Sequence, residues 1–349
     1  MSDLHFSVVP YDSCVDEVIA FRNTNRDVVR DQRYFEWRYK NRPCQKKALI
    51  VWGMDGRGNK VAAASIIPHD FHVLDGEYPV GMLGDISVAP EYRGRGVATH
   101  MLEYVQQDAA IQSLHACLVL PNDEAFRSLE RAGMSTATTI ARWVKMIDSG
   151  PRLKKIFGGS FPVLGIAQAI NSLARLASQE GWRSHRGPYR AIEISGFNQE
   201  FDELWREIPK QGKILALRNQ SYLHWRYRQH PAVDYRIIAI YRAQKLCGYV
   251  VFHVDGGIAM VDDFLAAEPS IGSWIIREFL QLVRNEDNVA DIYLRYNAVS
   301  AFAIPWARFG FIGRPDFQRV MINASQTKTK SAMLSNESCW FVTAGDKDV

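Results

Sequence analysis

The sequence is poor in cysteine and has no arrangement of it that would hold a fold together. Its five cysteines are widely spaced and contain no CxxC pair. The nine histidines show neither HxH nor HExxH spacing. A disulfide framework is therefore not expected, and no metal site is predicted. Reduced thiols in the cytoplasm are the simplest expectation for such a chain.

Long apolar runs and a strong charge imbalance are also missing. No segment has the roughly 18 consecutive apolar residues that a membrane-spanning helix needs, and the N-terminus lacks the basic and apolar regions of a secretory signal. Lys and Arg number 42 against 38 Asp and Glu in 349 residues. This mild surplus suits small anionic ligands but not a nucleic-acid surface. We expect a cytoplasmic protein with no nucleic-acid partner and no stable membrane insertion.

Apolar residues are plentiful at 47%, and the length of 349 residues fits two domains. The segment 30–39 (RDQRYFEWRY) recurs in register as 218–227 (RNQSYLHWRY), and two apolar runs follow each copy. Further along, 84–88 matches 262–266, and 129–134 matches 306–311. Because the matches come in the same order, they predict tandem copies of one fold. Trp37 and Trp225 are expected to be core anchors.

The stretch between the copies differs in character. We place a first domain at 1–147, a linker with a helix at 148–190, and a second domain at 191–349. In the linker, the spacing of Ile166, Ile170, Leu173 and Leu176 is helical. One interpretation is a connecting helix packed against both domains. The other is an amphipathic helix on a membrane surface, which the short, Ala-rich apolar face disfavours. Basic residues would support the second interpretation: Lys154, Lys155, Arg175 and Arg183.

The end of the chain supplies two smaller expectations. Cys339–Thr343 has the composition of a final strand. Asp346 and Asp348 follow it and are expected to be solvated, with a role in gripping a cationic acceptor if that strand returns to a cleft between the domains.

The segment 83–105 (LGDISVAPEYRGRGVATHMLEYV) is the most informative in the chain. It begins as a β-rich strand that Pro90 must end. Val97, Met101 and Val105 then recur at helical spacing. The glycines between strand and helix let a ligand approach the backbone, and the first amides of a helix form a site for anions. The loop therefore predicts a pyrophosphate site, with Arg93 and Arg95 adding positive charge.

This segment, Val88-x-Pro90-x-x-Arg93-Gly94-x-Gly96-x-Ala98, resembles the acyl-CoA motif of the GNAT superfamily of N-acyltransferases. Downstream, Asn122-x-x-Ala125-x-x-x-Leu129-x-x-x-Gly133 resembles the second motif of that family. The resemblance implies an α/β fold of the α+β, mixed-sheet kind. We expect two tandem GNAT folds, each with a largely antiparallel sheet flanked by helices, and a degenerate second copy.

The resemblance also implies roles for individual residues. The co-substrate would be acetyl-CoA or another acyl-CoA, and no metal is required. The backbone of Ile86, Ser87 and Val88 would pair with the pantetheine arm. Asn122 would contact pantetheine or, equally, cap its own helix. The pyrophosphate would be held by the amides of seven residues: Arg93, Gly94, Arg95, Gly96, Val97, Ala98 and Thr99.

Catalysis is less well defined by the sequence. Asp85 is the candidate general base; alternatively, it caps a neighbouring loop or pairs with an arginine, as buried acids often do. The family commonly has a tyrosine as general acid where this chain has Leu129, which cannot donate a proton. In the second copy the glycine loop is missing and Glu268 lies where an anion site needs positive charge, so we expect no coenzyme A there.

The predicted function is direct acyl transfer, with acetyl-CoA or another acyl-CoA as donor, to a small amine, an amino sugar or an amino-acid-like acceptor. The acceptor would lie between the two domains or beside the linker helix. Two alternatives remain open. One is a non-catalytic acyl-CoA-binding protein. The other is an aminoacyl transferase similar to the enzymes of peptidoglycan cross-bridges, which use aminoacyl-tRNA but generally lack the intact loop.

Overall fold

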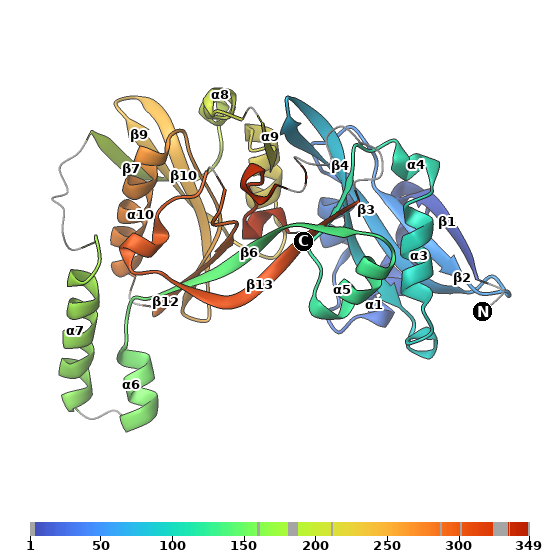
Figure 1. Ribbon diagram of the computed structural model, residues 1–349. Helices are drawn as coiled ribbons and strands as arrows, with labels where there is room; N and C mark the ends of the chain where they lie inside the picture. Colours follow the sequence, from blue (N-terminus) through green and yellow to red (C-terminus); the bar gives the residue numbers. More distant parts are fainter. Residues whose placement is uncertain are drawn as a thin grey trace.

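The computed structural model describes residues 4–158, 161–180, 188–210, 212–286, 288–300, 302–323, 334 and 336–347. Within these residues one mixed, largely antiparallel sheet of 13 strands runs through the whole molecule. Helices cover it on both sides, and the two halves of the chain lie side by side along it (Figure 1). The expected fold class, a mixed α/β sheet flanked by helices, is confirmed.

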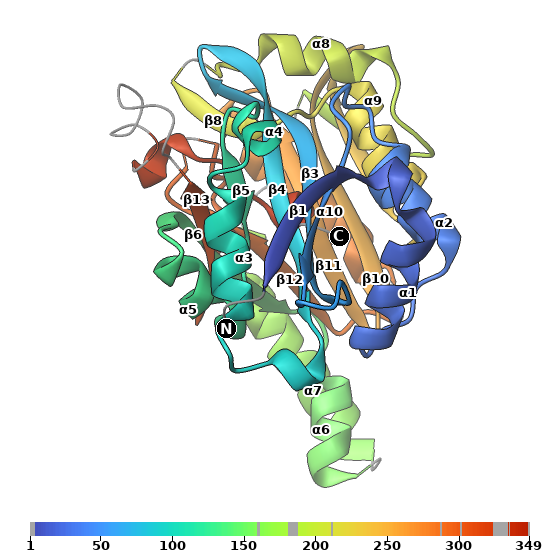
Figure 2. The same ribbon diagram turned by 90° about the vertical axis from the view of Figure 1, so that its right-hand side faces the viewer.

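The first half supplies the strands at one end of the sheet. Its elements are β1 (His5–Pro10), α1 (Val15–Asn25), α2 (Gln32–Phe35), η2 (Glu36–Lys40), β2 (Leu49–Met54), β3 (Lys60–Leu74), β4 (Gly76–Val88), α3 (Val97–Val105), α4 (Ala109–Gln112), β5 (Cys117–Val119), α5 (Asp123–Arg131) and β6 (Ser135–Met146). Successive side chains of β2 point to opposite faces of the sheet and enter two different cores. Ile50 and Trp52 pack in the core beneath α1 and α2, whereas Val51 packs in the core beneath α3 and α5 (Figure 2).

The second half supplies the other end. Its elements are β7 (Tyr189–Ile194), α8 (Gln199–Glu207), β8 (Lys213–Ala216), α9 (Gln220–Leu223), η4 (His224–Arg228), β9 (Arg236–Arg242), β10 (Lys245–Asp255), β11 (Ile258–Ala266), α10 (Pro269–Arg284), β12 (Asp291–Tyr296), η5 (Trp306–Phe309) and β13 (Ile312–Asn323). β9, β10, β11 and β12 are adjacent in the sheet. α10 packs on β10 and β11 through Ile275, Ile276 and Phe279, which are fully buried.

The two halves exchange strands at their junction. The sheet order across it is β4-β5-β13-β6-β12, so a strand from the end of the chain lies between two strands of the first half. Met321 on β13 pairs with Val119 on β5, and Val320 pairs with Thr138 on β6. β6 also pairs with β12, where Met146 faces Asp291. The sheet therefore crosses the domain boundaries predicted at 147 and 191, which remain a prediction.

The repeated segments take the same local structure in both halves. Asp31 accepts a hydrogen bond from the Tyr34 amide at 3.0 Å and begins α2, as Asn219 does with Tyr222 at 2.9 Å for α9. A π-helical turn, η2 or η4, follows each helix and carries a tryptophan. The two indoles stack at 5.2 Å and each donates to the backbone carbonyl of the other tryptophan. Trp37 and Trp225 are both 3% exposed, so the predicted core anchors are confirmed, and they join the halves.

The linker differs from the expectation. α6 (Gly150–Phe157) and α7 (Phe161–Leu176) form a hairpin that projects away from the sheet (Figures 1 and 2). Leu173 and Leu176 are 67% and 60% exposed. The prediction of a helix packed against both domains is therefore wrong, because α7 packs on α6 and leaves the side chains of Ile166, Leu173 and Leu176 exposed. Arg183 lies outside the described residues.

The end of the chain also departs from the prediction. Cys339 belongs to the 3₁₀ turn η6 (Glu337–Cys339), and the following residues make only isolated bridges, Trp340 with Ile214 and Thr343 with Tyr296. Asp346 is 8% exposed and pairs with the buried Arg218 at 2.7 Å, so the expectation that it is solvated is wrong. A buried guanidinium needs carboxylate partners, and Asp346 is one of them. Asp348 lies outside the described residues.

Candidate functional site

A gap opens in the sheet between β4 and β5. The two strands run parallel and pair at Gly81 with Cys117 and at Met82 with Leu118. On the other side of β4, Ser65 faces Gly84 and Ala63 faces Ser87, so two residues of β4, Asp85 and Ile86, lie opposite a single residue of β3. This β-bulge disrupts the pairing of β4 with β3, just beyond the point where its pairing with β5 ends. The backbone edge of residues 83–88 therefore faces the gap.

The glycine loop closes one end of this gap. It follows the 3₁₀ turn η3 (Pro90–Tyr92) and ends where α3 begins at Val97. Gly94 and Gly96 have φ values of 73° and 78°, in the left-handed region that favours glycine. A Cβ on Gly94 would meet nothing within 4 Å, so backbone conformation rather than space requires glycine there. The loop turns the first amides of α3 toward the gap, where they have no partners within the helix.

Loop and strand line a common cavity of about 500 Å³. The structure thus brings together nearly all of the predicted cofactor-binding residues, from Ile86 to Asn122. Arg95 is not among the lining residues, because its guanidinium lies over the Tyr92 ring at 5.7 Å. Arg93 does line it, and its Nε donates to the Val88 carbonyl at 3.0 Å. The predicted residues in the lining are Ile86, Ser87, Val88, Arg93, Gly94, Gly96, Val97, Ala98, Thr99 and Asn122.

A second cavity of about 470 Å³ continues from the first, and both are lined by Arg26, Ile86 and Asn122. The Asn122 carboxamide accepts a hydrogen bond from the Ala125 amide at 2.9 Å. The helix-cap alternative for Asn122 is therefore confirmed, and the cap places its side chain where the two cavities meet. The second cavity is rich in basic residues: Arg22, Arg26, Arg30, Arg38 and Lys347.

Asp85, the predicted base, lies at the bulge and is held by several partners. Its carboxylate forms ion pairs with Arg22 and with Arg38, whose Nε is 2.9 Å away, and accepts a hydrogen bond from the Tyr39 hydroxyl. Burial raises the pKa of the carboxyl, but Arg38, Arg22 and Tyr39 outweigh it and hold the pKa at about 2. A carboxylate with so low a pKa is a weak base. The geometry therefore favours the paired alternative.

The tyrosines near the loop do not replace the missing general acid. The Tyr92 hydroxyl donates to Asp55 at 3.0 Å and the Tyr104 hydroxyl to Asp108 at 3.4 Å. Leu129, at the position of the family tyrosine, is fully buried in the core beneath α3 and α5. In the second half, the corresponding connection runs from β11 to α10, and Glu268 directly precedes the helix. This connection contains no glycine, as expected from the sequence. Absence of cofactor there remains a prediction.

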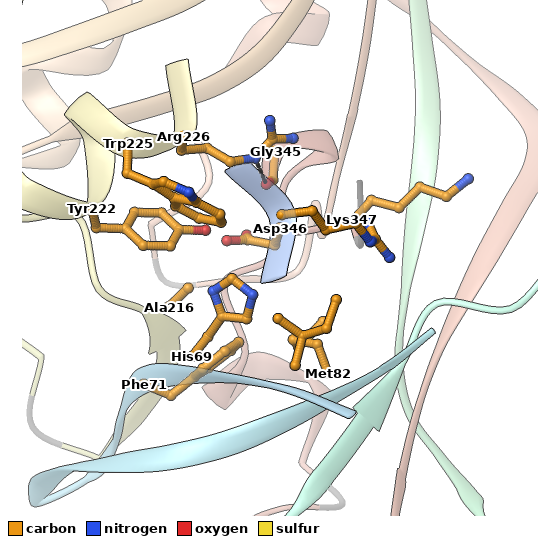
Figure 3. Close-up of a pocket in the computed structure, with 12 residues that line it drawn as sticks. His69, Phe71, Met82, Ala216, Tyr222, Trp225, Arg226, Gly345, Asp346 and Lys347 are labelled. Atoms are coloured by element: carbon orange, nitrogen blue, oxygen red, sulfur yellow. Dashed lines mark hydrogen bonds between the residues drawn. The ribbon is translucent and has the colours of Figure 1, made fainter. Parts of the chain in front are cut away.

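A small inner cavity lies between the halves, beside the second one (Figure 3). Its volume is about 20 Å³, enough for roughly one water molecule, so it does not hold a substrate as it stands. Arg226 from η4 reaches across it to the Gly345 carbonyl at 3.1 Å. Burial lowers the pKa of His69 well below its usual value, and the nearby arginines Arg42, Arg38 and Arg226 lower it further. His69 is thus a neutral imidazole at neutral pH.

Several lining residues were not identified from the sequence. Arg22 lies on the last turn of α1 and Arg26 directly follows the helix, a spacing visible in the sequence, but nothing there shows that this end of α1 meets β4. Lys347 comes from the end of the chain, which returns to this region and brings a cation to the second cavity, whereas Asp346 lines the inner one. Among the described residues there is no cluster of three or more potential metal ligands. No helix in the same part of the chain has the length and apolarity to span a bilayer.

Comparison with known proteins identifies a family domain in the first half of the chain. Residues 14–122 match the Acetyltransferase (GNAT) domain. No curated protein matches the chain in sequence. Among solved structures, a protein from Enterococcus faecalis described as a probable N-acyltransferase of unknown function superposes with a TM-score of 0.63 at 12% identity, covering 92% of this chain and 72% of that one.

Two further solved structures extend the comparison. A GCN5-related N-acetyltransferase from Anabaena variabilis gives a TM-score of 0.62 at 13% identity over 92% of this chain and 73% of its own. The N-myristoyltransferase of Saccharomyces cerevisiae, with bound myristoyl-CoA, gives 0.55 at 13% identity over 92% and 79%. At these identities the likeness shows the fold. The matched stretch contains β4, the bulge and the glycine loop, so residues 14–122 form a GNAT domain.

Proposed function

We propose that this protein is an acyl-CoA-dependent N-acyltransferase, with acetyl-CoA as the first candidate donor. The acceptor would be a small amine, an amino sugar or an amino-acid-like molecule. One observation carries the proposal: the glycine loop, the start of α3 and the edge of β4 that no neighbouring strand covers line the same cavity. A pyrophosphate needs backbone amides and positive charge, and a pantetheine arm needs an unpaired strand edge.

The donor would lie along this cavity from the loop toward the bulge. Backbone amides from Arg93 to Thr99 would hold the pyrophosphate, and the edge from Ile86 to Val88 would pair with the pantetheine amides. Arg26 occupies part of that edge, because its Nη2 donates to the Ile86 carbonyl at 2.9 Å. Arg26 is exposed, so its side chain can move when a pantetheine amide takes the same carbonyl. The thioester would then lie where the two cavities join.

The acceptor amine would enter through the second cavity, between α1 and the start of α5. Its nitrogen would attack the thioester carbon, forming the N–C bond while the C–S bond breaks. The nitrogen would lose one proton to water, and the departing thiolate would take one proton up from water. The linker hairpin is remote from this cavity, which leaves the first half and the end of the chain as its walls (Figure 1). Asp85 would position α1 and η2 against β4 rather than take the proton.

The proposal is tested by calorimetric titration of the full chain with acetyl-CoA. The variant Gly96→Glu puts a carboxylate where the pyrophosphate would lie, and Gly256→Glu is its matched control. Gly256 also has a positive φ, 53°, with nothing near its missing Cβ, but lies in the turn after β10. We expect one site per chain in wild type and control and none in Gly96→Glu. Absence of binding to folded wild type would overturn the proposal. Longer acyl-CoA thioesters, titrated in parallel, identify the preferred donor.

A non-catalytic acyl-CoA-binding protein is the alternative that the structure supports. Leu129 is fully buried where the family has its acid, and Asp85 is paired. The two functions differ in thiol release. An acyltransferase releases coenzyme A when a suitable amine is added, whereas the binding protein binds acetyl-CoA and releases none with any amine of a broad panel.

A further inference from the structure

The α6–α7 hairpin exposes an unusual amount of apolar surface. Ile156 and Phe157, at the end of α6, are 69% and 67% exposed. On α7, Ile166, Leu173 and Leu176 are 51%, 67% and 60% exposed. The hairpin projects from the second half of the molecule, and Figure 1 shows it clear of the sheet, at the opposite end of the molecule from α3. A cluster of exposed apolar side chains on a folded protein indicates a surface that binds another protein, a membrane or a ligand.

These side chains form one stripe on each helix. On α6, Leu153, Ile156 and Phe157 recur at three- and four-residue spacing. On α7, Ile166 and Leu173 are two turns apart, and Leu176 lies one turn beyond. A different face of α7 packs on α6. There Ala167 is 4% exposed, and its carbonyl accepts a hydrogen bond from the Ser149 hydroxyl at 3.3 Å.

The sequence alone disfavours a membrane-surface helix, because the apolar face of α7 is short and rich in alanine. The structure shows that part of this face is used within the hairpin. Alanines shorten the apolar face when the helix is viewed alone, but Ala167 is used to join the two helices. Asn171 fastens the same contact, because its side chain bonds to the Ser149 amide and to Asp148, both at 2.9 Å. The larger side chains are thereby left for an external partner.

The charge of the hairpin identifies that partner. The sequence from 149 to 178 contains Arg152, Lys154, Lys155 and Arg175 but no Asp or Glu. Arg152 is bound to Asp291 of the sheet, whereas Lys154 and Lys155 are exposed next to Ile156 and Phe157. A second copy of the chain would bring like charges together. A surface of anionic phospholipid offers negative charge beside an apolar layer, which matches both properties.

We propose that the α6–α7 hairpin docks this protein on the surface of an anionic lipid bilayer. The apolar stripes would enter the boundary between headgroups and acyl chains, and Lys154 and Lys155 would lie among the headgroups. The helices lie in the interface and do not span it. This inference does not depend on acyl transfer, because the hairpin is separate from the cofactor cavity.

The test is flotation of the full chain with vesicles of phosphatidylcholine alone or with about one part in three of phosphatidylglycerol. Two double variants remove the proposed contacts: Ile156→Ser with Phe157→Ser, and Leu173→Ser with Leu176→Ser. The matched control is Val299→Ser with Ile312→Ser, since these side chains are 57% and 58% exposed but lie outside the hairpin. A charge variant, Lys154→Glu with Lys155→Glu, is compared with Lys40→Glu with Lys46→Glu, two exposed lysines of the first half.

We expect wild type and both controls to bind the anionic vesicles, more weakly at high salt. The hairpin variants should lose at least about tenfold in affinity, because each apolar side chain buried in the interface contributes a factor of that order. Unchanged thermal unfolding shows that they are folded, as expected for exposed positions. No vesicle binding by wild type, or equal binding by hairpin variants and controls, would overturn the proposal. So would a dimer, seen by sedimentation, that the hairpin substitutions dissociate.

Discussion

Replacing Asp85 by asparagine separates a positioning role from a catalytic one. Asparagine is close in shape and tolerates a positive φ, here 57°, so the bulge in β4 should persist. The substitution removes the negative charge that Arg22 and Arg38 share. Both ion pairs are protected from solvent, since the Asp85 side chain is 12% exposed and that of Arg38 3%.

The structure sets the size of the effect. Breaking a buried ion pair from one side costs roughly 3 kcal/mol, so we expect Asp85→Asn to lower the free energy of unfolding by about that amount. The pKa of about 2 gives an independent estimate: its depression below the usual carboxyl value is worth roughly 2 kcal/mol. Because the folded-state pKa is depressed, this contribution is present above about pH 4 and is lost as the pH falls toward 2.

The assay combines urea unfolding at several pH values with turnover of the folded fraction. For a positioning residue, stability falls, the pH dependence between about 4 and 2 flattens, and turnover per folded molecule stays within about tenfold. Tyr39→Phe is a graded control, because it removes one hydrogen bond to the same carboxylate and should cost roughly 1.5 kcal/mol. A loss of turnover of about 10²- to 10⁴-fold at unchanged stability would instead identify Asp85 as the base and refute this reasoning.

Three further outcomes are expected. Leu129→Tyr should not raise turnover, because the fully buried site has no room for the ring, and denaturant unfolding should show a loss of roughly 1–3 kcal/mol. Burial raises the pKa of the Cys117 thiol to about 12, so thiol titration at neutral pH should find it unreactive until the protein is unfolded. A fragment ending at residue 147 should not unfold cooperatively in thermal melts monitored by circular dichroism.

The cofactor loop was predictable because its determinants are local. A strand, a proline stop, two glycines and a helix follow one another within a short segment, and each acts on its own neighbours. The same holds for the paired segments around Trp37 and Trp225, whose matching residues form matching turns. Glycine at 94 and 96 is required by backbone conformation, which the residue type itself reveals.

The features that the sequence did not predict depend on distant contacts. The partners of Asp85 are one such feature. Pairing with an arginine was one alternative, but Arg22 on α1 and Arg38 on η2 both reach the bulge, and no spacing in the sequence relates these three segments. Asp346 is buried because Arg218 needs it. The linker helices have an apolar face of the kind that usually packs on a core, and their sequence does not show that the rest of the chain leaves this face uncovered.

The exchange of strands makes the first half dependent on the second. In the intact chain β6 lies between β13 and β12, and both of these come from residues beyond 147. A fragment of 1–147 would therefore leave the whole of β6 without a neighbour and β5 with only its short pairing to β4. Its cores would lose residues as well, since Val320, Ile322, Trp340 and Val342 pack with the first half on one face of the sheet, and Met321 on the other.

The candidate site lies mostly in the first half of the chain, yet it forms only when the second half completes the sheet. The glycine loop, the bulge and α1 all lie before residue 147, yet the sheet that fixes the distance between β4 and β5 is completed by β13. Cooperative melting of the fragment together with acyl-CoA binding would contradict this view. That result would mean that β6 can pair directly with β5 and that the second half is an addition to a self-sufficient domain.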